Sequence, residues 1–420
     1  MVGEISFDKT IPPRSWCQRR LRFSLELFRR IVPQMKLEHG LQLAYCTNIH
    51  RGETWPETFH SLSAYALAVR EKVCPNRPFA IGLRLGERAA TELSEPGNLL
   101  EFRRWLEKNS CYVFTINGFP YGRFHGSRVK EQVYRPDWTS PERVAYTNLL
   151  FDLLASLVPA GMEGSVSTLP GSFKEFHPSA AAQQAIRKNL WSTVEHIAHV
   201  SAKTGRKLHL GLEPEPLCLL ESSAETIHFF DQMRADHPHD ARLAEHLGVN
   251  YDTCHFAVEF EEPQQALPCL IHHGIKISKI HLSSALKVVP TPEAREELRK
   301  FSDEVYLHQV VARDAAGHRR IFRDLPDALA NHAPAEEWRI HFHVPLHAPA
   351  AAPFQNTNDH LLGVLDLLQT HPGICQHLEM ETYTWEVLPP ELKSQSVVDQ
   401  LAQEYDWTLA ELRKRGLARG

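Results

Sequence analysis

Four segments of the chain place an acidic or imidazole side chain at the end of a short apolar run. They read Leu-Glu-Pro at 212–214, Asp-Thr-Cys-His at 252–255, Ile-His-Leu at 280–282 and Leu-Glu-Met-Glu-Thr at 378–382. Together they offer Glu213, Asp252, His281 and either Glu381 or Glu379. Carboxylate oxygens mixed with an imidazole nitrogen suit zinc, manganese, iron or cobalt better than calcium, without selecting one of these metals. The sequence therefore predicts a divalent transition-metal site.

Each of these side chains also has a purely structural interpretation. Asp252 before Thr253 is typical of a helix N-cap, His281 of a histidine satisfied within a core, and Glu213 with Glu215 of a charged loop. However, four ionisable groups buried at separate strand ends are costly unless they compensate one another. We therefore favour one shared metal site.

Histidine is unusually frequent, with 25 in 420 residues. Imidazole is the commonest metal ligand in proteins and the usual proton shuttle near neutral pH. His255 lies three residues beyond Asp252, so it is a candidate for a further ligand, a base or a ligand of a second metal. His341 and His343 lie on one side of an extended segment, where they are either exposed or part of the site, with His343 as a candidate ligand.

Short apolar runs alternate with amphipathic segments along the chain. Strands buried on both faces of a parallel sheet give such runs, without strict alternation of polar residues. The candidate strands are 41–47, 79–85, 112–117, 165–169, 207–213, 247–252, 276–283 and 377–382. Eight strands with helical connections predict an α/β fold, a (β/α)8 TIM barrel, and the alternative is two smaller α/β domains. In the barrel, the ninth extended piece at 338–346 belongs to an insertion between strands seven and eight, on the catalytic face.

The expected organisation has an N-terminal extension at 1–40, the barrel at 41–390 and a C-terminal helix within 391–420. Helices are expected at 178–204, 224–235, 292–301 and 394–415. Ser223 and Thr291 are the expected N-caps of the second and third of these helices.

Polar and aromatic residues near the strand ends are candidates for substrate contacts. Strand one leads into Asn48-Ile49-His50 and then Trp55, and the stretch 117–138 mixes glycines and aromatic residues with polar tips. Such a stretch suits a loop over a small polar organic ligand, although a packed surface loop is the alternative. Lys174 ends the segment 168–174, which lacks the glycine-lysine-serine pattern of a phosphate-binding loop. The candidate substrate contacts are Asn117, Tyr121, His125, Trp55 and Lys174.

Composition limits the classes of partner. The formal net charge is -5 and the sequence pI is about 6.6, so broad attraction to nucleic acid or an anionic membrane is not expected. The most apolar stretch, near 149–160, is too short to span a bilayer, and Met1 to Thr10 lacks the pattern of a secretory signal. Eight dispersed cysteines without a C-x-x-C pair favour reduced thiols in a cytoplasmic protein.

The four metal-site segments resemble those of the xylose isomerase-like TIM barrels, in the same order and at the expected strands. That superfamily includes sugar isomerases, sugar epimerases and the apurinic-site endonucleases. The resemblance implies that Glu213, Asp252, His281 and Glu381 are the metal ligands, with Glu379 as an alternative. It also implies that Glu213 and Glu381 exchange a proton with the substrate, assisted by His255 or His50. In the endonucleases a histidine matches His255, whereas their Asp-x-His is here His-x-His at 341–343.

Three longer motifs are similar to a family of metabolite-traffic proteins, the EboE family. They are Tyr-Cys-Thr-Asn-Ile-His at 45–50, Asn-Gly-Phe-Pro-Tyr-Gly at 117–122 and Glu-Thr-Tyr-Thr-Trp at 381–385. This resemblance implies a small-metabolite role beside other proteins of one gene cluster, including a prenyltransferase-like membrane protein and a dehydroquinate-synthase-like protein.

Three functions follow from the sequence. The first is a metal-dependent isomerase or epimerase of a sugar-like or cyclitol-like polyhydroxy compound, in which metal polarises a carbonyl. The second is a metal-dependent hydrolase, for example of a phosphoester, favoured by the extra histidines. The third is a non-catalytic carrier or scaffold that binds a metabolite in the barrel mouth.

Overall fold

A computed structural model describes residues 37–125, 129–348, 352–387 and 396–419. Residues 1–36 of the expected N-terminal extension lie outside this part of the chain, as does Cys17. The C-terminal helix is α15 (Val397–Lys414), and the side chain of Ser396 caps it by accepting from the Asp399 amide.

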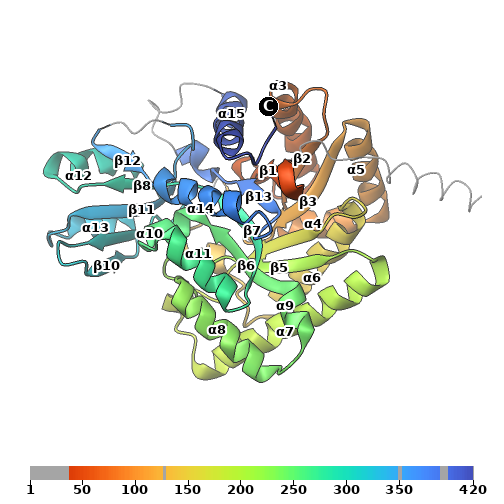
Figure 1. Cartoon of the computed structure of the whole chain (residues 1–420), viewed down its shortest axis with the longest axis horizontal. Coiled ribbons are helices and arrows are strands. Elements are labelled where there is room, and N and C mark those ends of the chain that lie inside the picture. Colours follow the sequence, from red (N-terminus) through yellow and green to blue (C-terminus); the bar gives the residue numbers. More distant parts are fainter. Residues whose placement is uncertain (1–36, 126–128, 349–351, 388–395, 420) are drawn as a thin grey trace, which may run out of the picture. The chain divides into compact units, whose positions relative to one another are not determined.

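Eight parallel strands form one sheet that closes into a barrel (Figure 1). The hydrogen-bonded order is β1-β13-β7-β6-β5-β4-β3-β2, and a parallel bridge between Cys46 and Gly82 joins the two ends of this order. The strands are β1 (Gln42–Tyr45), β2 (Phe79–Arg84), β3 (Cys111–Asn117), β4 (Gly164–Thr168), β5 (Leu208–Leu212), β6 (Leu247–Asp252), β7 (Lys276–Leu282) and β13 (His377–Met380). The predicted (β/α)8 barrel is confirmed. Each predicted strand begins and ends within two residues of the corresponding observed strand.

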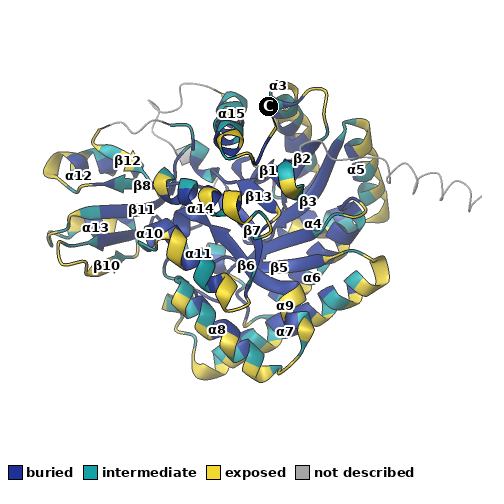
Figure 2. Ribbon diagram, viewed as in Figure 1, coloured by how far each residue is buried: buried dark blue, intermediate teal, exposed yellow. Residues whose placement is uncertain are grey.

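Helices surround the barrel with their exposed residues on the outer side, whereas the barrel strands are buried except for Lys276 at the start of β7 (Figure 2). The α-helices around it are α2 (Trp55–Ser61), α3 (Leu67–Val73), α4 (Glu87–Ser94), α5 (Pro96–Lys108), α6 (Pro141–Leu157), α7 (Ala180–Thr204), α8 (Ser223–Asp236), α9 (Ala241–His246), α10 (Thr253–Val258), α11 (Pro263–His272) and α14 (Asn358–Thr370). A π-helical turn at Leu62–Ala66 joins α2 to α3. The expected cap at Ser223 is wrong, because Ser222 accepts from the Glu225 amide, whereas Thr291 caps α12 (Pro292–Leu298) as expected.

Between β7 and β13 the chain forms a second, five-stranded antiparallel sheet in the order β10-β9-β11-β8-β12. Its strands are β8 (Ala285–Val288), β9 (Val310–Arg313), β10 (Arg319–Phe322), β11 (Glu337–His343) and β12 (Phe354–Asn356), and α12 and α13 (Leu325–Ala330) accompany them. The sheet has its own apolar core around Trp338, Ile340 and Phe342. The end of β11 meets the barrel, since Val344 donates its amide to the Ser284 carbonyl just after β7. The second sheet thus carries β11 to the mouth of the barrel.

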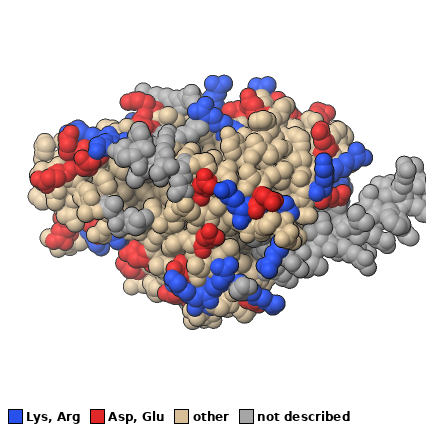
Figure 3. Space-filling model, turned by 90° about the horizontal axis from the view of Figure 1, so that it is seen from above, with Lys and Arg blue, Asp and Glu red and all other residues tan. Residues whose placement is uncertain are grey.

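The surface carries both signs of charge. Lysine and arginine are interspersed with aspartate and glutamate over the face in Figure 3. In the part of the chain that the structure describes, no helix has the length and apolar character needed to cross a membrane. Seven of the eight cysteines are described, all as free thiols, and only Cys269 among them is not fully buried.

Candidate metal centre

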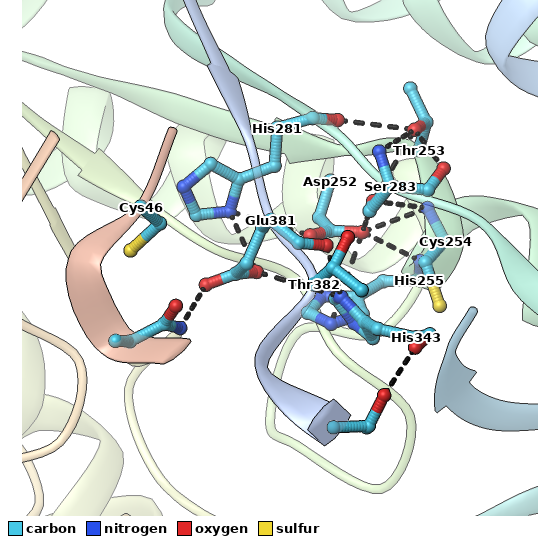
Figure 4. A network of polar contacts seen from close by, with 12 residues as sticks. Cys46, Asp252, Thr253, Cys254, His255, His281, Ser283, His343, Glu381 and Thr382 are labelled. Atoms are coloured by element: carbon cyan, nitrogen blue, oxygen red, sulfur yellow. Dashed lines mark hydrogen bonds and ion pairs between the residues drawn. The ribbon is translucent and has the colours of Figure 1, made fainter. Parts of the chain in front are cut away.

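Four side chains from the carboxyl ends of neighbouring strands converge on one point. Glu213 follows β5, Asp252 ends β6, His281 lies in β7 and Glu381 follows β13. Their potential ligand atoms all lie within 4.8 Å of one another, and all four residues are buried. His281 Nδ1 lies 3.1 Å from Glu213 Oε1, 3.3 Å from Asp252 Oδ2 and 3.1 Å from Glu381 Oε2. Figure 4 shows His281, Asp252 and Glu381 of this group. We call these four residues the primary set.

Asp252 serves both of the roles that its sequence context suggests. Its Oδ1 caps α10 by accepting from the amides of Cys254 and His255, and it also accepts from Ser283 Oγ at 2.6 Å. Its Oδ2 has no hydrogen-bond partner and faces the other members of the primary set. The cap therefore fixes the carboxylate so that one oxygen remains available as a ligand.

Two amides hold Glu381 in the same way. Asn48 Nδ2 and Asn117 Nδ2 donate to Glu381 Oε1 over 2.7 and 3.1 Å, which leaves Oε2 directed at His281. Asn117, expected as a substrate contact, thus orients a member of the primary set. Asn48 has the same orienting role, which its sequence context did not predict.

Glu379 is not placed as a metal ligand, which corrects the alternative left open by the sequence. Its Oε2 lies 2.9 Å from His281 Nε2, on the opposite side of the ring from the primary set, and 2.5 Å from Lys279 Nζ. A carboxylate oxygen can only accept from a ring N–H, so Glu379 fixes a proton on Nε2. The carboxylates beside Nδ1 likewise accept from that nitrogen in the metal-free protein, and although burial opposes the charge, Glu381 and Glu213 hold the pKa of His281 well above its usual value. A metal ion in the primary set would take the place of the Nδ1 proton. Gly82 makes room for the carboxylate of Glu379, because a Cβ there would lie 1.9 Å from Glu379 Oε1.

The charges of the primary set favour a bound cation. Burial alone would raise the pKa of Asp252, but His255, His281 and His343 hold it well below its usual range. Likewise burial opposes ionisation of Glu213, yet His281 keeps the pKa of Glu213 lowered. Buried oxygens without hydrogen-bond partners remain on both residues, at Glu213 Oε2 and Asp252 Oδ2. Three carboxylates beside one imidazole therefore fit a divalent metal such as zinc, manganese, iron or cobalt.

Three histidines form a second cluster against Asp252. Each has its Nδ1 on an oxygen that can only accept: His255 on the Pro214 carbonyl at 3.0 Å, His341 on Gln309 Oε1 at 2.8 Å and His343 on the Glu381 carbonyl at 3.0 Å. These contacts favour the neutral tautomer with its proton on Nδ1, in which each Nε2 has a free lone pair. The Nε2 atoms of His341 and His343 have no hydrogen-bond partner, and the three ring centroids are 4.6–5.6 Å apart. The geometry of Asp252, His255 and His343 also fits a metal ion.

A cavity of about 550 Å³, solvent at its mouth included, opens beside both clusters. Of the predicted site residues, Glu213, Glu381, His255 and Asn117 line it, whereas Asp252 and His281 lie behind them. The stretch 117–138, expected as a loop over a ligand, contributes Phe119, Phe124, Lys130 and Tyr134 to the lining. Lining residues without a predicted role are Asn48, Glu215, Tyr306, Leu307 and Tyr383. Glu215 had a signal in Glu-Pro-Glu at 213–215, and burial raises its pKa to about 7.

Two predicted residues near strand one lie away from this cavity. His50 bonds through Nε2 to the Tyr45 hydroxyl at 3.0 Å and stacks on Tyr65, so it is not placed as an acid or base beside the primary set. Trp55 opens α2 and packs in the core against Phe59 and Phe102 rather than covering a pocket.

Three expected substrate contacts are also placed elsewhere. Tyr121 packs edge-on against Tyr146. Lys174 pairs with Glu221 at 2.6 Å and Glu225 at 2.7 Å, which occupies its ammonium group. His125 is buried, with its Nδ1 4.0 Å from Glu53 Oε1, and it does not line the cavity. The residue types of Tyr121, His125 and Lys174 suit a binding site, but packing partners distant in the sequence decide where they lie.

Comparisons with known proteins identify neighbours in fold. No protein-family description matches the chain, and no curated protein matches its sequence. Among solved structures, an L-ribulose 3-epimerase is similar, with 11% identity over 89% of this chain and 95% of its own, at a TM-score of 0.47. A D-tagatose 3-epimerase-like protein is similar with 13% identity over 89% of this chain and 97% of its own, at a TM-score of 0.47. A xylose isomerase-like TIM barrel protein from Mycobacterium smegmatis, in complex with magnesium, is similar with 13% identity over 83% of this chain and 87% of its own, at a TM-score of 0.46. The barrel assignment itself rests on the strand order and its closure.

Proposed function

We propose that this protein is a divalent-metal-dependent isomerase or epimerase of a small hydroxylated carbonyl metabolite. The observation that carries the proposal is the unequal exposure of the primary set to the cavity. All four members can hold one metal, yet only the carboxylates of Glu213 and Glu381 also line the cavity. These two are therefore the members that can meet a substrate carbon.

The chain's own groups divide the work. Asp252 and His281 would hold a divalent ion together with Glu213 and Glu381, and such an ion would supply Lewis acidity toward a substrate carbonyl. We infer that Glu213 and Glu381 take a proton from the substrate and return it, and their position in the lining of the cavity supports this role. The amides of Asn48 and Asn117 fix Glu381 Oε1, so that the carboxylate keeps one orientation during this exchange.

A second candidate function is metal-dependent hydrolysis, and the three-histidine cluster favours it. Three Nε2 lone pairs beside Asp252 can hold a second ion, and two neighbouring ions can activate water and stabilise a leaving oxygen. One metal per chain supports isomerisation, whereas two or three support hydrolysis.

The test measures bound metal and then turnover. Elemental mass spectrometry of the purified full chain gives the metal count, with Asp252→Ala as the ligand-deficient variant. Turnover is then sought by incubating the metal-loaded protein with a panel of ketoses and cyclitol ketones in deuterated water. Isomerisation incorporates deuterium at the carbon beside the carbonyl, and Glu213→Gln and Glu381→Gln should abolish it while keeping ligand binding. Equal incorporation by wild type and both variants, or no metal uptake by the wild type, refutes the proposal. Ligand binding without turnover in the wild type supports the carrier instead.

The motifs at 45–50, 117–122 and 381–385 support membership of the EboE family. We propose on this basis a cytoplasmic role in processing a small polar metabolite, together with other proteins of the same gene cluster. Co-purification of those proteins with the tagged full chain tests the association.

A further inference from the structure

The cavity beside the primary set has two unlike parts. Acidic and imidazole side chains gather at the strand ends, whereas the loops above contribute aromatic and aliphatic groups. Phe119, Phe124 and Tyr134 come from the β3–α6 connection, and Tyr306 and Leu307 come from the segment before β9. We call these five residues the apolar wall.

The two tyrosines of the apolar wall turn their hydroxyls into the protein. Tyr134 donates to Glu215 Oε1 at 2.7 Å and accepts from Gln309 Nε2 at 2.9 Å. Tyr306 donates to the Phe124 carbonyl at 3.2 Å. Their rings, rather than their polar tips, are therefore what a ligand meets.

The one lysine lining the described part of the cavity is also committed to the protein. Lys130 Nζ lies 2.6 Å from Asp324 Oδ2 and 2.9 Å from the Asp303 carbonyl, and the residue is 6% exposed. It is not placed to bind a substrate phosphate or carboxylate. Among the described lining residues outside the strand ends, Tyr383 is the remaining side chain with a hydroxyl to offer.

These contacts are a poor match for a sugar chain. Each substrate hydroxyl placed against the apolar wall exchanges hydrogen bonds with water for none, which weakens binding by roughly ten- to a hundredfold. An apolar group placed there gains from leaving water.

We propose that the substrate joins its metal-binding oxygens to an apolar group, of the size of one ring or a short branched chain, which packs on the apolar wall. The proposal rests on the proposed function, because the metal-bound end sets the depth of the ligand. It distinguishes the substrate from a simple sugar, which carries hydroxyls along its whole length.

Three hydroxamates that share one metal-chelating group test the proposal. Acetohydroxamate has no arm, benzohydroxamate has an apolar ring and gluconohydroxamate has a polyhydroxylated arm. Calorimetry on the zinc-loaded full chain should give a dissociation constant for benzohydroxamate at least tenfold below those of the other two. Leu307→Asn, which introduces an amide into the apolar wall, should reduce this preference at least threefold. Leu100→Asn makes the same change at a side chain that is 48% exposed on α5, and it should keep the preference.

The outcomes separate this inference from the metal site. Equal affinities for benzohydroxamate and acetohydroxamate, tighter binding of gluconohydroxamate, or a preference that Leu307→Asn leaves unchanged overturns the inference, even if zinc is bound. Failure of zinc uptake, measured separately by elemental analysis, refutes the metal site instead. The same three ligands are then ranked on the metal-free protein, where benzohydroxamate should still bind more tightly than gluconohydroxamate, and the reverse order again overturns the inference.

Discussion

Replacing Lys279 with methionine removes the cation from a fully buried ion pair. Lys279 and Glu379 are both 0% exposed, with 2.5 Å between Nζ and Oε2. Burial opposes ionisation of Glu379, and it is Lys279 first and His281 second that hold the pKa of Glu379 at about 2. Breaking a buried pair by removing one partner costs about 3–5 kcal/mol. We expect Lys279→Met to lower the free energy of unfolding of the metal-free protein by that amount.

The double variant separates stability from metal binding. Lys279→Met with Glu379→Leu removes both charges of the pair and leaves only the His281 Nε2–H without its acceptor, so the free energy of unfolding should recover by about 2–3 kcal/mol relative to Lys279→Met alone. Zinc affinity should not recover, because leucine cannot accept the His281 Nε2 proton. Loss of such a partner lowers metal affinity by about 10–100-fold. Glu379→Gln keeps an acceptor oxygen and should lose less affinity than Glu379→Leu.

The assays are urea unfolding followed by circular dichroism and zinc competition against a fluorescent chelator. Lys287→Met is the matched control, because Lys287 pairs with Asp359 over 3.1 Å at a carboxylate that is 65% exposed. Such an exposed pair contributes less than about 1 kcal/mol. A cost for Lys279→Met no larger than this control, or strictly additive effects in the double variant, refutes the ion-pair reasoning. Wild-type zinc affinity in Glu379→Leu refutes the orienting role of Glu379.

Three further outcomes are expected. Burial lowers the pKa of His209 from 6.5 to about 4, so the stability that neutral His209 contributes is complete above pH 6.5 and falls by about 3 kcal/mol as pH falls toward 4. Urea unfolding at several pH values should therefore show a flatter dependence of the unfolding free energy on pH for His209→Gln than for the wild type. Parallel dependences in the two proteins would contradict this. Gly82→Ala should destabilise by at least about 2 kcal/mol, since its Cβ would lie 1.9 Å from Glu379 Oε1; an unchanged urea midpoint argues against the packing described. Zinc at 100 times its dissociation constant should stabilise the wild type by about 2.7 kcal/mol and Asp252→Asn much less, and equal thermal shifts in both would contradict the ligand assignment.

Sequence patterns were sufficient for the barrel because its strands are buried on both faces and so appear as short apolar runs. The primary set followed from the same reasoning, since the carboxyl ends of parallel strands meet at one face. The choice between Glu379 and Glu381 could not be made this way, because residues two apart on a strand point to the same side. The missing information was Lys279 on the neighbouring strand, which pairs with Glu379 inside the barrel.

Loop residues were harder to assign. Trp55 and Lys174 have the residue types expected of a binding site, but tertiary partners decide their positions. The aromatic ring of Trp55 packs edge-on against Phe102. The partners of Lys174 lie about fifty residues further along the chain. Neither partnership leaves a local sequence signal.

The pairing of β1 with β13 joins the first barrel strand to be synthesised with the last. Gln42 stands opposite His377 in this pair. At translation rates of roughly 5–20 residues per second, the edge of β1 that pairs with β13 stays unpaired for tens of seconds to about a minute during synthesis. Glu381 emerges from the ribosome just after β13, so the primary set is complete only when most of the chain has been made. A metal ion that needs all four ligands therefore cannot guide early folding of the nascent chain. It would bind only after the barrel has formed.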